Sequence, residues 1–176
     1  LSVRDGGRRR RGGRKPAVFC VGNRLMLDEG VGPAVYDAVL RDYEVPSNVR
    51  LFDVGCMSLD MLPYVESYDV IITVDAVDGT DSEPGTVFRY KPEDIARTQD
   101  AMASLHELKL VDLFDAAQLL GYSCDGICYG MQIENMSPAE LVEGLTPKVY
   151  ERLPFLVETV VAELDRQGYP LTRKEA

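Results

Sequence analysis

Residues 69–75, with the sequence DVIITVD, decide the fold of this 176-residue chain. The segment between the two aspartates is continuously apolar except for Thr73, without polar alternation, and this pattern is typical of a central strand covered on both faces. Such strands belong to parallel sheets, in which helices connect successive strands. The sequence therefore predicts a buried strand over residues 69–74 that ends at Asp75.

Strand-like and helix-like segments alternate on either side of this strand. Short apolar runs predict four more strands, and apolar residues at three- and four-residue spacing predict helices. The helix after Thr146 is expected to have that threonine as its cap and Pro147 at its first position. This order predicts an α/β fold, a three-layer sandwich with a mostly parallel twisted sheet and helices on both faces. The expected strands are 17–21, 49–54, 85–90 and 126–133, and the expected helices 31–43, 58–66, 92–96, 105–120 and 147 onward.

The two ends of the chain differ from its body. Residues 1–15 hold seven Arg or Lys residues without periodicity, which predicts a disordered basic tail or a cloning remnant. A nucleic-acid-binding arm is the alternative. Residues 16–170 are expected to form one α/β domain, and residues 171–176 a C-terminal tail. The apolar runs are too short for a membrane span or a secretory signal, so we expect a cytoplasmic protein without a membrane partner.

The body of the chain is strongly acidic. The whole chain has 19 basic and 29 acidic residues, and the first 15 residues hold seven and one of them, so the remainder carries a net charge of −16. Such a body repels phosphate backbones, which argues against nucleic acid as a substrate. A metal ion or a basic protein segment suits this charge better, although it also serves solubility.

The four cysteines do not indicate a disulfide framework or a zinc site. No two of them form a CxxC pair, so free and buried cysteines are expected. Cys20 and Cys56 follow predicted strands, which leaves a cysteine–histidine nucleophile pair as a disfavoured alternative. Cys124 and Cys128 are expected to pack. The chain also lacks GxGxxG, Walker, HExxH and GxSxG motifs.

Three polar residues are the candidates for chemistry. In α/β sheets, sites lie beyond the carboxyl ends of the strands, where the pair Asp28–Glu29 and the single residue Asp75 are expected. His106 is the only histidine in the chain, so any imidazole chemistry must use it. Each has a plainer explanation: Asp28 caps a helix with Glu29 in its first turn, Asp75 forms a turn, and His106 is structural.

Glu29, Asp75 and His106 together offer two carboxylates and one imidazole. This set suits a divalent transition metal with open coordination positions, and two carboxylates neutralise its charge. The strand-end rule brings Glu29 and Asp75 together, but the sequence does not establish that His106 joins them.

Several blocks of the sequence resemble the hydrogenase maturation proteases. The likeness covers residues 17–168, essentially everything outside the tails. It begins with the pattern GNxLxxDEGVG and continues through further blocks in the same order. Cys20 and Val54–Gly55 depart from the family, which often has Gly and Gly-Gly there. The blocks are residues 18–32, Asp53–Val54–Gly55, TVDAVDG (73–79), PGTVFRYKPEDI (84–95), SLHELKLVDLF (104–114) and GLTPKVYERLP (144–154).

This resemblance implies a five-stranded sheet between helices and a site built from Glu29, Asp75 and His106, which are both the metal ligands and the catalytic residues. The metal would be nickel supplied by the substrate, and other divalent metals are expected to bind in vitro. Asp28 and Asp53 are candidates for orienting these ligands or shaping the loop.

The resemblance also implies a function. The family removes a C-terminal extension from the nickel-loaded precursor of a hydrogenase large subunit, so the expected partner is that precursor and the expected enzyme is a monomeric cytoplasmic endopeptidase. One alternative is a non-catalytic nickel-binding chaperone on the same fold. The other is a hydrolase similar to peptidyl-tRNA hydrolases, which the acidic body disfavours.

Overall fold

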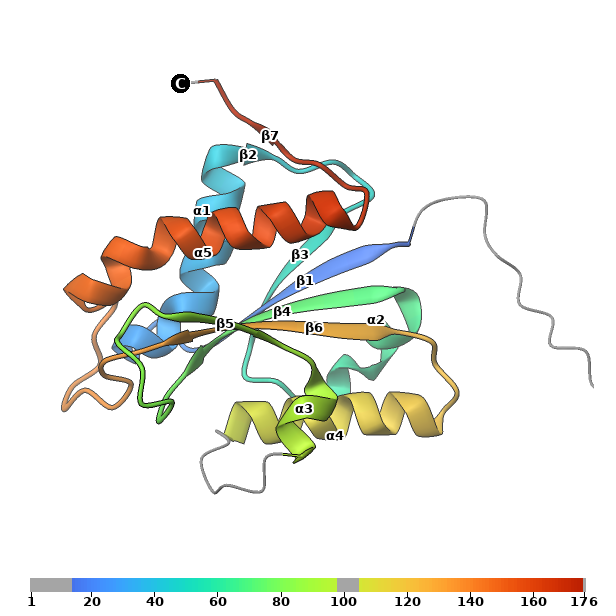
Figure 1. The fold of residues 1–176 in the computed structure, drawn as a ribbon, viewed down its shortest axis with the longest axis horizontal. Helices are drawn as coiled ribbons and strands as arrows, with labels where there is room; N and C mark the ends of the chain where they lie inside the picture. The colour runs from blue at the N-terminus through green and yellow to red at the C-terminus, as the bar shows by residue number, and fades with distance from the viewer. Residues whose placement is uncertain (1–13, 98–104, 176) are drawn as a thin grey trace, which may run out of the picture.

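The computed structural model describes residues 14–97 and 105–175, and for residues 96, 97 and 105–108 it describes the backbone alone. Five strands form one sheet in the order β3-β1-β4-β6-β5 (Figure 1). Strands β1, β3, β4 and β6 are parallel, and β5 is antiparallel to β6. The predicted five-stranded, mostly parallel sheet is confirmed. The strand bounds are β1 Pro16–Val21, β3 Arg50–Gly55, β4 Val70–Val77, β5 Val87–Tyr90 and β6 Asp125–Gln132.

Helices cover both faces of this sheet, which confirms the predicted three layers. Helices α1 (Val31–Asp42) and α5 (Pro147–Arg166) lie on one face, and α2 (Leu62–Ser67), α3 (Pro92–Arg97) and α4 (Leu105–Leu119) lie on the other (Figure 1). A short 3-10 turn, η2 (Leu59–Met61), precedes α2, so the helix predicted over 58–66 forms in two parts. No helix in the described ranges is long and apolar enough to cross a bilayer.

Strand β4 is buried along its whole length and separates two apolar cores. Ile72 and Val74 pack in the core under α1 and α5, whereas Ile71 packs with Leu110 and Leu113 of α4. Side chains alternate along a strand, so Thr73 and Asp75 belong to the same face as Ile71. Strand β4 therefore points Asp75 toward the α4 side of the sheet.

The predicted end of β4 at residue 74 is wrong. The strand continues to Val77, and Asp75 pairs with Gly130 of β6. Parallel pairing continues because β6 extends to Gln132 and supplies hydrogen-bond partners beyond the apolar run. Asp75 thus lies inside the strand, on a rigid element.

The chain ends are more structured than the sequence predicts. Residues 172–173, expected in a C-terminal tail, form β7 (Thr172–Arg173), which pairs antiparallel with β2 (Tyr43–Glu44). At the other end, Arg14 forms an ion pair with Asp125, and the Lys15 backbone N–H donates to Asp69. The rest of the expected N-terminal tail, residues 1–13, lies outside the described residues.

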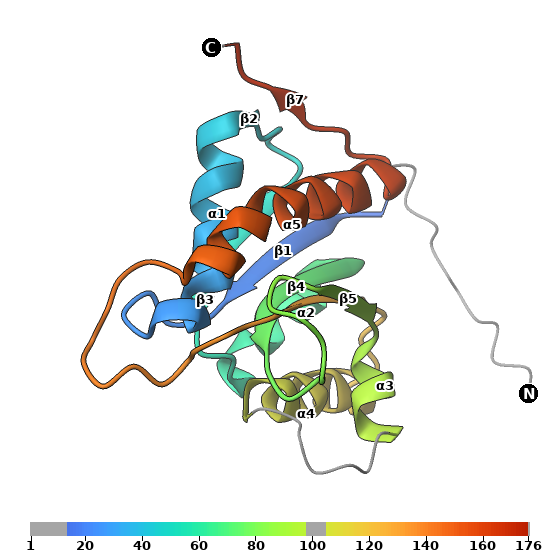
Figure 2. The ribbon, with the colours of Figure 1, turned by 60° about the vertical axis from the view of Figure 1, so that its left-hand side comes forward.

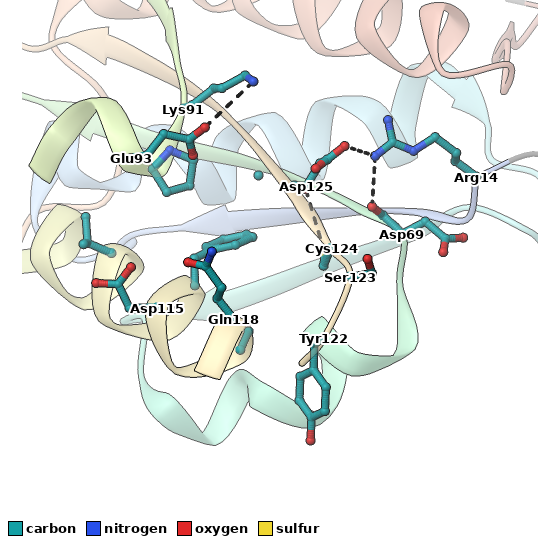
Figure 3. A pocket seen from close by; sticks show the side chains of 15 residues that line it. Arg14, Asp69, Lys91, Glu93, Asp115, Gln118, Tyr122, Ser123, Cys124 and Asp125 are labelled. Atoms are coloured by element: carbon teal, nitrogen blue, oxygen red, sulfur yellow. Dashed lines mark hydrogen bonds and ion pairs between the residues drawn. The ribbon is translucent and has the colours of Figure 1, made fainter. Parts of the chain in front are cut away.

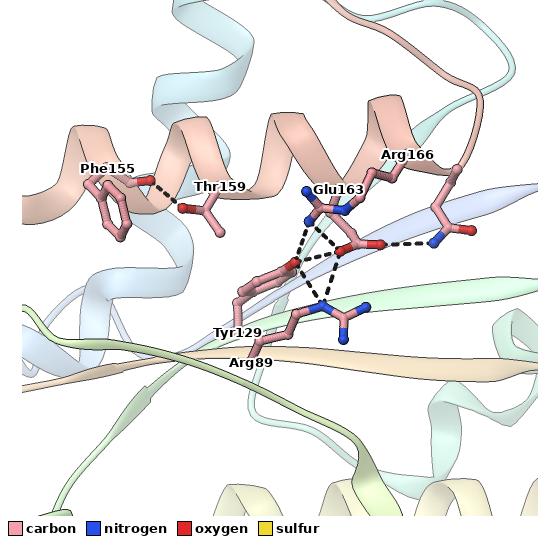
Figure 4. Close-up of polar contacts among 7 residues, drawn as sticks. Arg89, Tyr129, Phe155, Thr159, Glu163 and Arg166 are labelled. Atoms are coloured by element: carbon pink, nitrogen blue, oxygen red, sulfur yellow. Dashed lines mark hydrogen bonds and ion pairs between the residues drawn. The ribbon is translucent and has the colours of Figure 1, made fainter.

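A buried ionic cluster fixes α5 to the sheet (Figure 4). The Glu163 side chain is 1% exposed, and its carboxylate accepts hydrogen bonds from Tyr129 Oη at 2.5 Å and from Arg166 at 2.7 Å. Arg89 of β5 donates to the same oxygen at 3.3 Å, and Gln167 donates to the other at 2.8 Å. Burial raises the pKa of Glu163, but these hydrogen bonds outweigh it and lower that pKa to about 2.

Candidate functional site

The segment after β1 folds back tightly against the end of that strand. It includes the 3-10 turn η1 (Leu27–Gly30), which carries Asp28 and Glu29 and leads directly into α1. A Cβ atom on Gly22, which has φ of +141°, would lie 1.9 Å from the backbone oxygen of Glu29. A Cβ atom on Gly32 would lie 2.0 Å from the backbone oxygen of Val21. The two glycines are therefore required for η1, and Glu29 with it, to lie at the carboxyl edge of the sheet.

Glu29 and Asp75 lie on elements that contact each other. Turn η1 contacts β4, although the two residues are 46 positions apart in the sequence. Glu29 is half-buried, whereas Asp75 is 5% exposed. The Asp75 carboxylate accepts a hydrogen bond from the backbone N–H of Ala76 at 2.8 Å. The structure thus brings the elements of these two candidates together.

His106 is the second residue of α4, and only its backbone is described. Helix α4 precedes β6, which is parallel to β4, so α4 runs back across the sheet and begins at its carboxyl edge (Figure 1). It covers the face to which Asp75 points. The described backbone therefore places His106 at the same edge and on the same side as Asp75, while its side chain lies outside the described atoms.

The chemistry of these residues fits a divalent transition metal. Two carboxylates supply anionic oxygens, and the helix that begins at this edge carries the only histidine. One buried polar atom of the described residues has no hydrogen-bond partner, namely Thr73 Oγ1, two residues before Asp75 on the same face. Among described side chains, which exclude that of His106, no three His, Cys, Asp or Glu residues group as a metal site.

Asp28 performs a different task from Glu29. Its side chain is fully buried, and its carboxylate accepts hydrogen bonds from the backbone N–H groups of Glu134, Asn135 and Thr146 at 3.1, 2.9 and 2.7 Å. The Thr146 hydroxyl donates a fourth at 2.8 Å. These four contacts, which we call the Asp28 latch, join η1 to the segment of residues 134–146 between β6 and α5. Asp28 does not cap α1, whose N-cap is Gly30 without a side-chain hydrogen bond.

The sequence does not predict the contact of Asp28 with residues 134–146. Thr146 was expected to cap α5, but its side chain makes no cap hydrogen bond and donates to Asp28 instead. The residues that meet Asp28 lie 106 to 118 positions away. No local pattern indicates this pairing, although the block 144–154 belongs to the resemblance.

Asp53, the other residue expected to shape the site, acts through Arg24. Arg24 of the post-β1 segment donates to Asp53 at 2.7 Å and to Asp37 of α1 at 3.0 Å. The hydrogen bonds that Arg24 donates to Asp37 and Asp53 raise the pKa of its guanidinium, which stays charged. This pairing ties the segment to β3 and α1.

The cysteines do not support a nucleophile. Cys20 is fully buried on the α1 side of the sheet, opposite Asp75, and burial raises the pKa of its thiol. Cys128 is buried within β6 and packs in the core under α4, as expected. All four cysteines are free, as expected, but Cys56 is exposed rather than buried because it follows β3 at the surface.

A pocket of about 570 Å³ lies at the other edge of the sheet from Glu29 and Asp75 (Figure 3). It lies between α3, α4 and the start of β6, and it includes the ion pair of Arg14 with Asp125. Asp125 begins β6 beside Val70, the first residue of β4. The pocket is therefore at the amino edge of the parallel strands, opposite Glu29, where such sheets seldom bind ligands.

Known proteins are similar to this chain in sequence and in fold. A family model described as hydrogenase maturation protease matches residues 33–163, a span that includes Asp75 and His106. The chain is 32% identical over 160 residues to a hydrogenase expression/formation protein of Rhodobacter capsulatus, covering 89% of this chain and 74% of that protein. It is 28% identical to the hydrogenase 2 maturation protease of Escherichia coli, covering 90% and 96%.

A solved structure supports the same family. The hydrogenase maturating endopeptidase HybD from E. coli superposes with a TM-score of 0.81 at 27% identity, covering 91% of this chain and 98% of that one. Sequence and fold thus agree over nearly the whole length of the chain. The chain belongs to the hydrogenase maturation protease family and is a peptidase.

Proposed function

We propose that this peptidase removes the C-terminal extension of a nickel-loaded hydrogenase large-subunit precursor, and that Glu29, Asp75 and His106 hold the precursor's nickel. The observation that carries this proposal is the contact of η1 with β4, which brings the elements of Glu29 and Asp75 together at the edge where α4 begins. His106 is the second residue of α4. The names of the relatives, which are hydrogenase maturation proteases, support a hydrogenase precursor as the partner.

Each residue has a distinct part in this proposal. Asp75 lies in a buried strand, where a low dielectric strengthens attraction to a cation, and the Ala76 N–H orients its carboxylate. Glu29 supplies the second negative charge, and His106 supplies a neutral nitrogen ligand. When the enzyme holds the precursor's nickel, the scissile peptide bond lies beside the site, and this positioning raises the rate of cleavage. The proposed setting is the cytoplasm, with a monomeric enzyme and neither membrane nor nucleic acid as partner.

The test is cleavage of purified precursor by purified enzyme, followed by mass spectrometry. Wild type is expected to cleave the nickel-loaded precursor at one position and to leave the nickel-free precursor intact. Glu29→Gln, Asp75→Asn and His106→Ala are each expected to abolish cleavage while circular dichroism stays unchanged. The matched control is Glu66→Gln, which changes an exposed carboxylate on α2 and should cleave like wild type.

Two results would contradict the proposal. Full cleavage by well-folded His106→Ala would remove the histidine from the site. Saturable nickel binding by wild type without cleavage of any loaded precursor would favour the non-catalytic chaperone. A gel shift with tRNA addresses the hydrolase alternative, and the net charge of −16 on residues 16–176 predicts no shift.

A further inference from the structure

The segment of residues 134–146 forms a projection beside the candidate site. It follows β6, leads into α5, and extends from the end of the sheet together with the loop before α1 (Figure 2). Both loops lie at the carboxyl edge, where Glu29 is located. The pair is thus positioned to meet a substrate that reaches Glu29.

The two loops are bonded to each other along their backbones. Leu27 N–H donates to the Val142 oxygen at 2.9 Å, Val142 N–H donates to the Leu25 oxygen at 2.9 Å, and Asp28 N–H donates to the Asn135 oxygen at 3.2 Å. Met26 and Val142 form a parallel bridge. With the Asp28 latch, these bonds hold residues 134–146 in a fixed position relative to Glu29.

The surface of this junction is apolar and acidic. Leu25, Leu141 and Val142 are 47%, 71% and 39% exposed, and the backbones of Leu25 and Val142 are hydrogen-bonded to each other. The neighbouring Glu140 and Glu143 are exposed, and residues 134–146 contain no Lys or Arg. We call the five residues Leu25, Glu140, Leu141, Val142 and Glu143 the lip. Exposed apolar residues grouped with one sign of charge are typical of a binding surface.

Two cations near the lip, Arg24 and Lys148, pair with carboxylates outside the lip. Arg24, next to Leu25, forms ion pairs with Asp37 and Asp53. Lys148, two residues beyond Thr146, lies 3.9 Å from Glu83. Glu140 and Glu143 form no ion pair with the described residues, so the lip presents negative charge around apolar side chains and suits a partner with apolar side chains flanked by Lys or Arg.

We propose that the lip is the docking surface for the C-terminal segment of the precursor, bound as an extended stretch of apolar residues with basic neighbours. This inference rests on the proposed function, because that function brings the end of the precursor to Glu29. The lip is bonded to the loop that carries Glu29 through the backbone hydrogen bonds of Val142 with Leu27 and Leu25, so a segment that leaves the nickel on this side meets the lip. Its charge excludes acidic segments, which gives the enzyme a means of choosing among precursors.

The test measures KM and kcat for cleavage of the nickel-loaded precursor. Leu141→Asp and Val142→Asp are expected to raise KM about tenfold each with kcat nearly unchanged, since a docking surface contributes uniform binding. The matched control is Leu119→Asp: Leu119 is 89% exposed at the far end of α4, so this change should leave KM unaltered. Glu140→Lys combined with Glu143→Lys is expected to raise KM and to abolish the increase of the wild-type KM with salt.

The outcomes separate this proposal from the proposed function. If wild type cleaves the precursor and Leu141→Asp has an unchanged KM, the lip is not the docking surface and the function stands. If wild type cleaves no precursor, the function itself fails. A wild type that is dimeric in sedimentation and becomes monomeric in Leu141→Asp would assign the lip to a second copy of the chain and overturn the proposal.

Discussion

Two buried carboxylates, Asp28 and Glu163, are satisfied in opposite ways. Glu163 lies under α5 away from the site, and two guanidinium groups, Arg89 and Arg166, neutralise it. Asp28 lies at the carboxyl edge, and its partners in the described part of the chain are three backbone N–H groups and one hydroxyl. Two cations thus join the uncharged donors Tyr129 and Gln167 around Glu163, whereas the described donors to Asp28 are all uncharged.

This difference matches the location of the candidate site. A guanidinium beside Asp28 would place a positive charge one residue from Glu29 and would weaken binding of a cation there. Backbone N–H groups satisfy the carboxylate while adding no net charge. Away from the site, strong ion pairing carries no such cost. The comparison therefore predicts that Asp28 variants affect cleavage, whereas Glu163 variants affect stability alone.

The largest effect is expected for Asp28→Ala. The change leaves three part-buried N–H groups and the Thr146 hydroxyl without their acceptor, and each such loss costs up to about 1–3 kcal/mol. We expect the free energy of unfolding in urea to fall by about 3 kcal/mol or more. Cleavage should be lost even at temperatures where the variant stays folded. Folded Asp28→Ala with wild-type kcat and KM would separate the latch from the site.

Glu163→Gln is expected to have a smaller effect, confined to stability. The side chains of Arg89 and Arg166 are half-exposed, so water compensates part of the lost pairing. We expect the free energy of unfolding to fall by about 1–2 kcal/mol. Cleavage measured at 25 °C should match wild type. A loss of cleavage in the folded variant would show that the two regions are coupled.

Acid provides an independent check on the Glu163 cluster. Its hydrogen bonds lower the pKa of Glu163 from 4.5 to about 2, so the folded state binds this proton more weakly than the unfolded state. The resulting stabilisation is complete above pH 4.5 and is lost as the pH falls from 4.5 toward 2. Urea unfolding of wild type over this range should therefore lose stability more steeply than that of Glu163→Gln. Parallel pH profiles would contradict the assignment.

The sequence predicts the sheet better than it predicts the contacts at the site. Strands β1 and β4 follow from continuous apolar runs, because burial on both faces imposes a pattern that is visible locally. The glycines of the post-β1 loop and the acidic pair Asp28–Glu29 are also visible. The sequence therefore predicts that the post-β1 loop and Asp75 lie at the same carboxyl edge, but it does not establish that His106 joins them.

The sequence does not indicate how those residues are held. The Asp28 latch closes between residues more than 100 positions apart, and a local capping pattern explains Asp28 and Thr146 equally well. The extension of β4 past Asp75 likewise depends on β6, which is 55 residues further along the chain at Gly130. Contacts between distant segments determine both the Asp28 latch and the length of β4. The hydrophobic periodicity of a single segment does not indicate such contacts.

The smallest predicted effect is the sharpest probe of the latch. Thr146→Val removes only the hydroxyl that donates to Asp28, while the backbone N–H of residue 146 keeps its bond. We expect the free energy of unfolding to fall by about 1 kcal/mol and KM for the precursor to rise a few-fold, because residues 134–146 are less firmly fixed. Thr146→Ser should restore both values. Thr159→Val is the matched control on α5, the helix that follows Thr146, since the Thr159 hydroxyl donates within α5 to the Phe155 oxygen. If Thr159→Val raises KM as much as Thr146→Val does, the effect comes from α5 and the latch has no part in substrate binding.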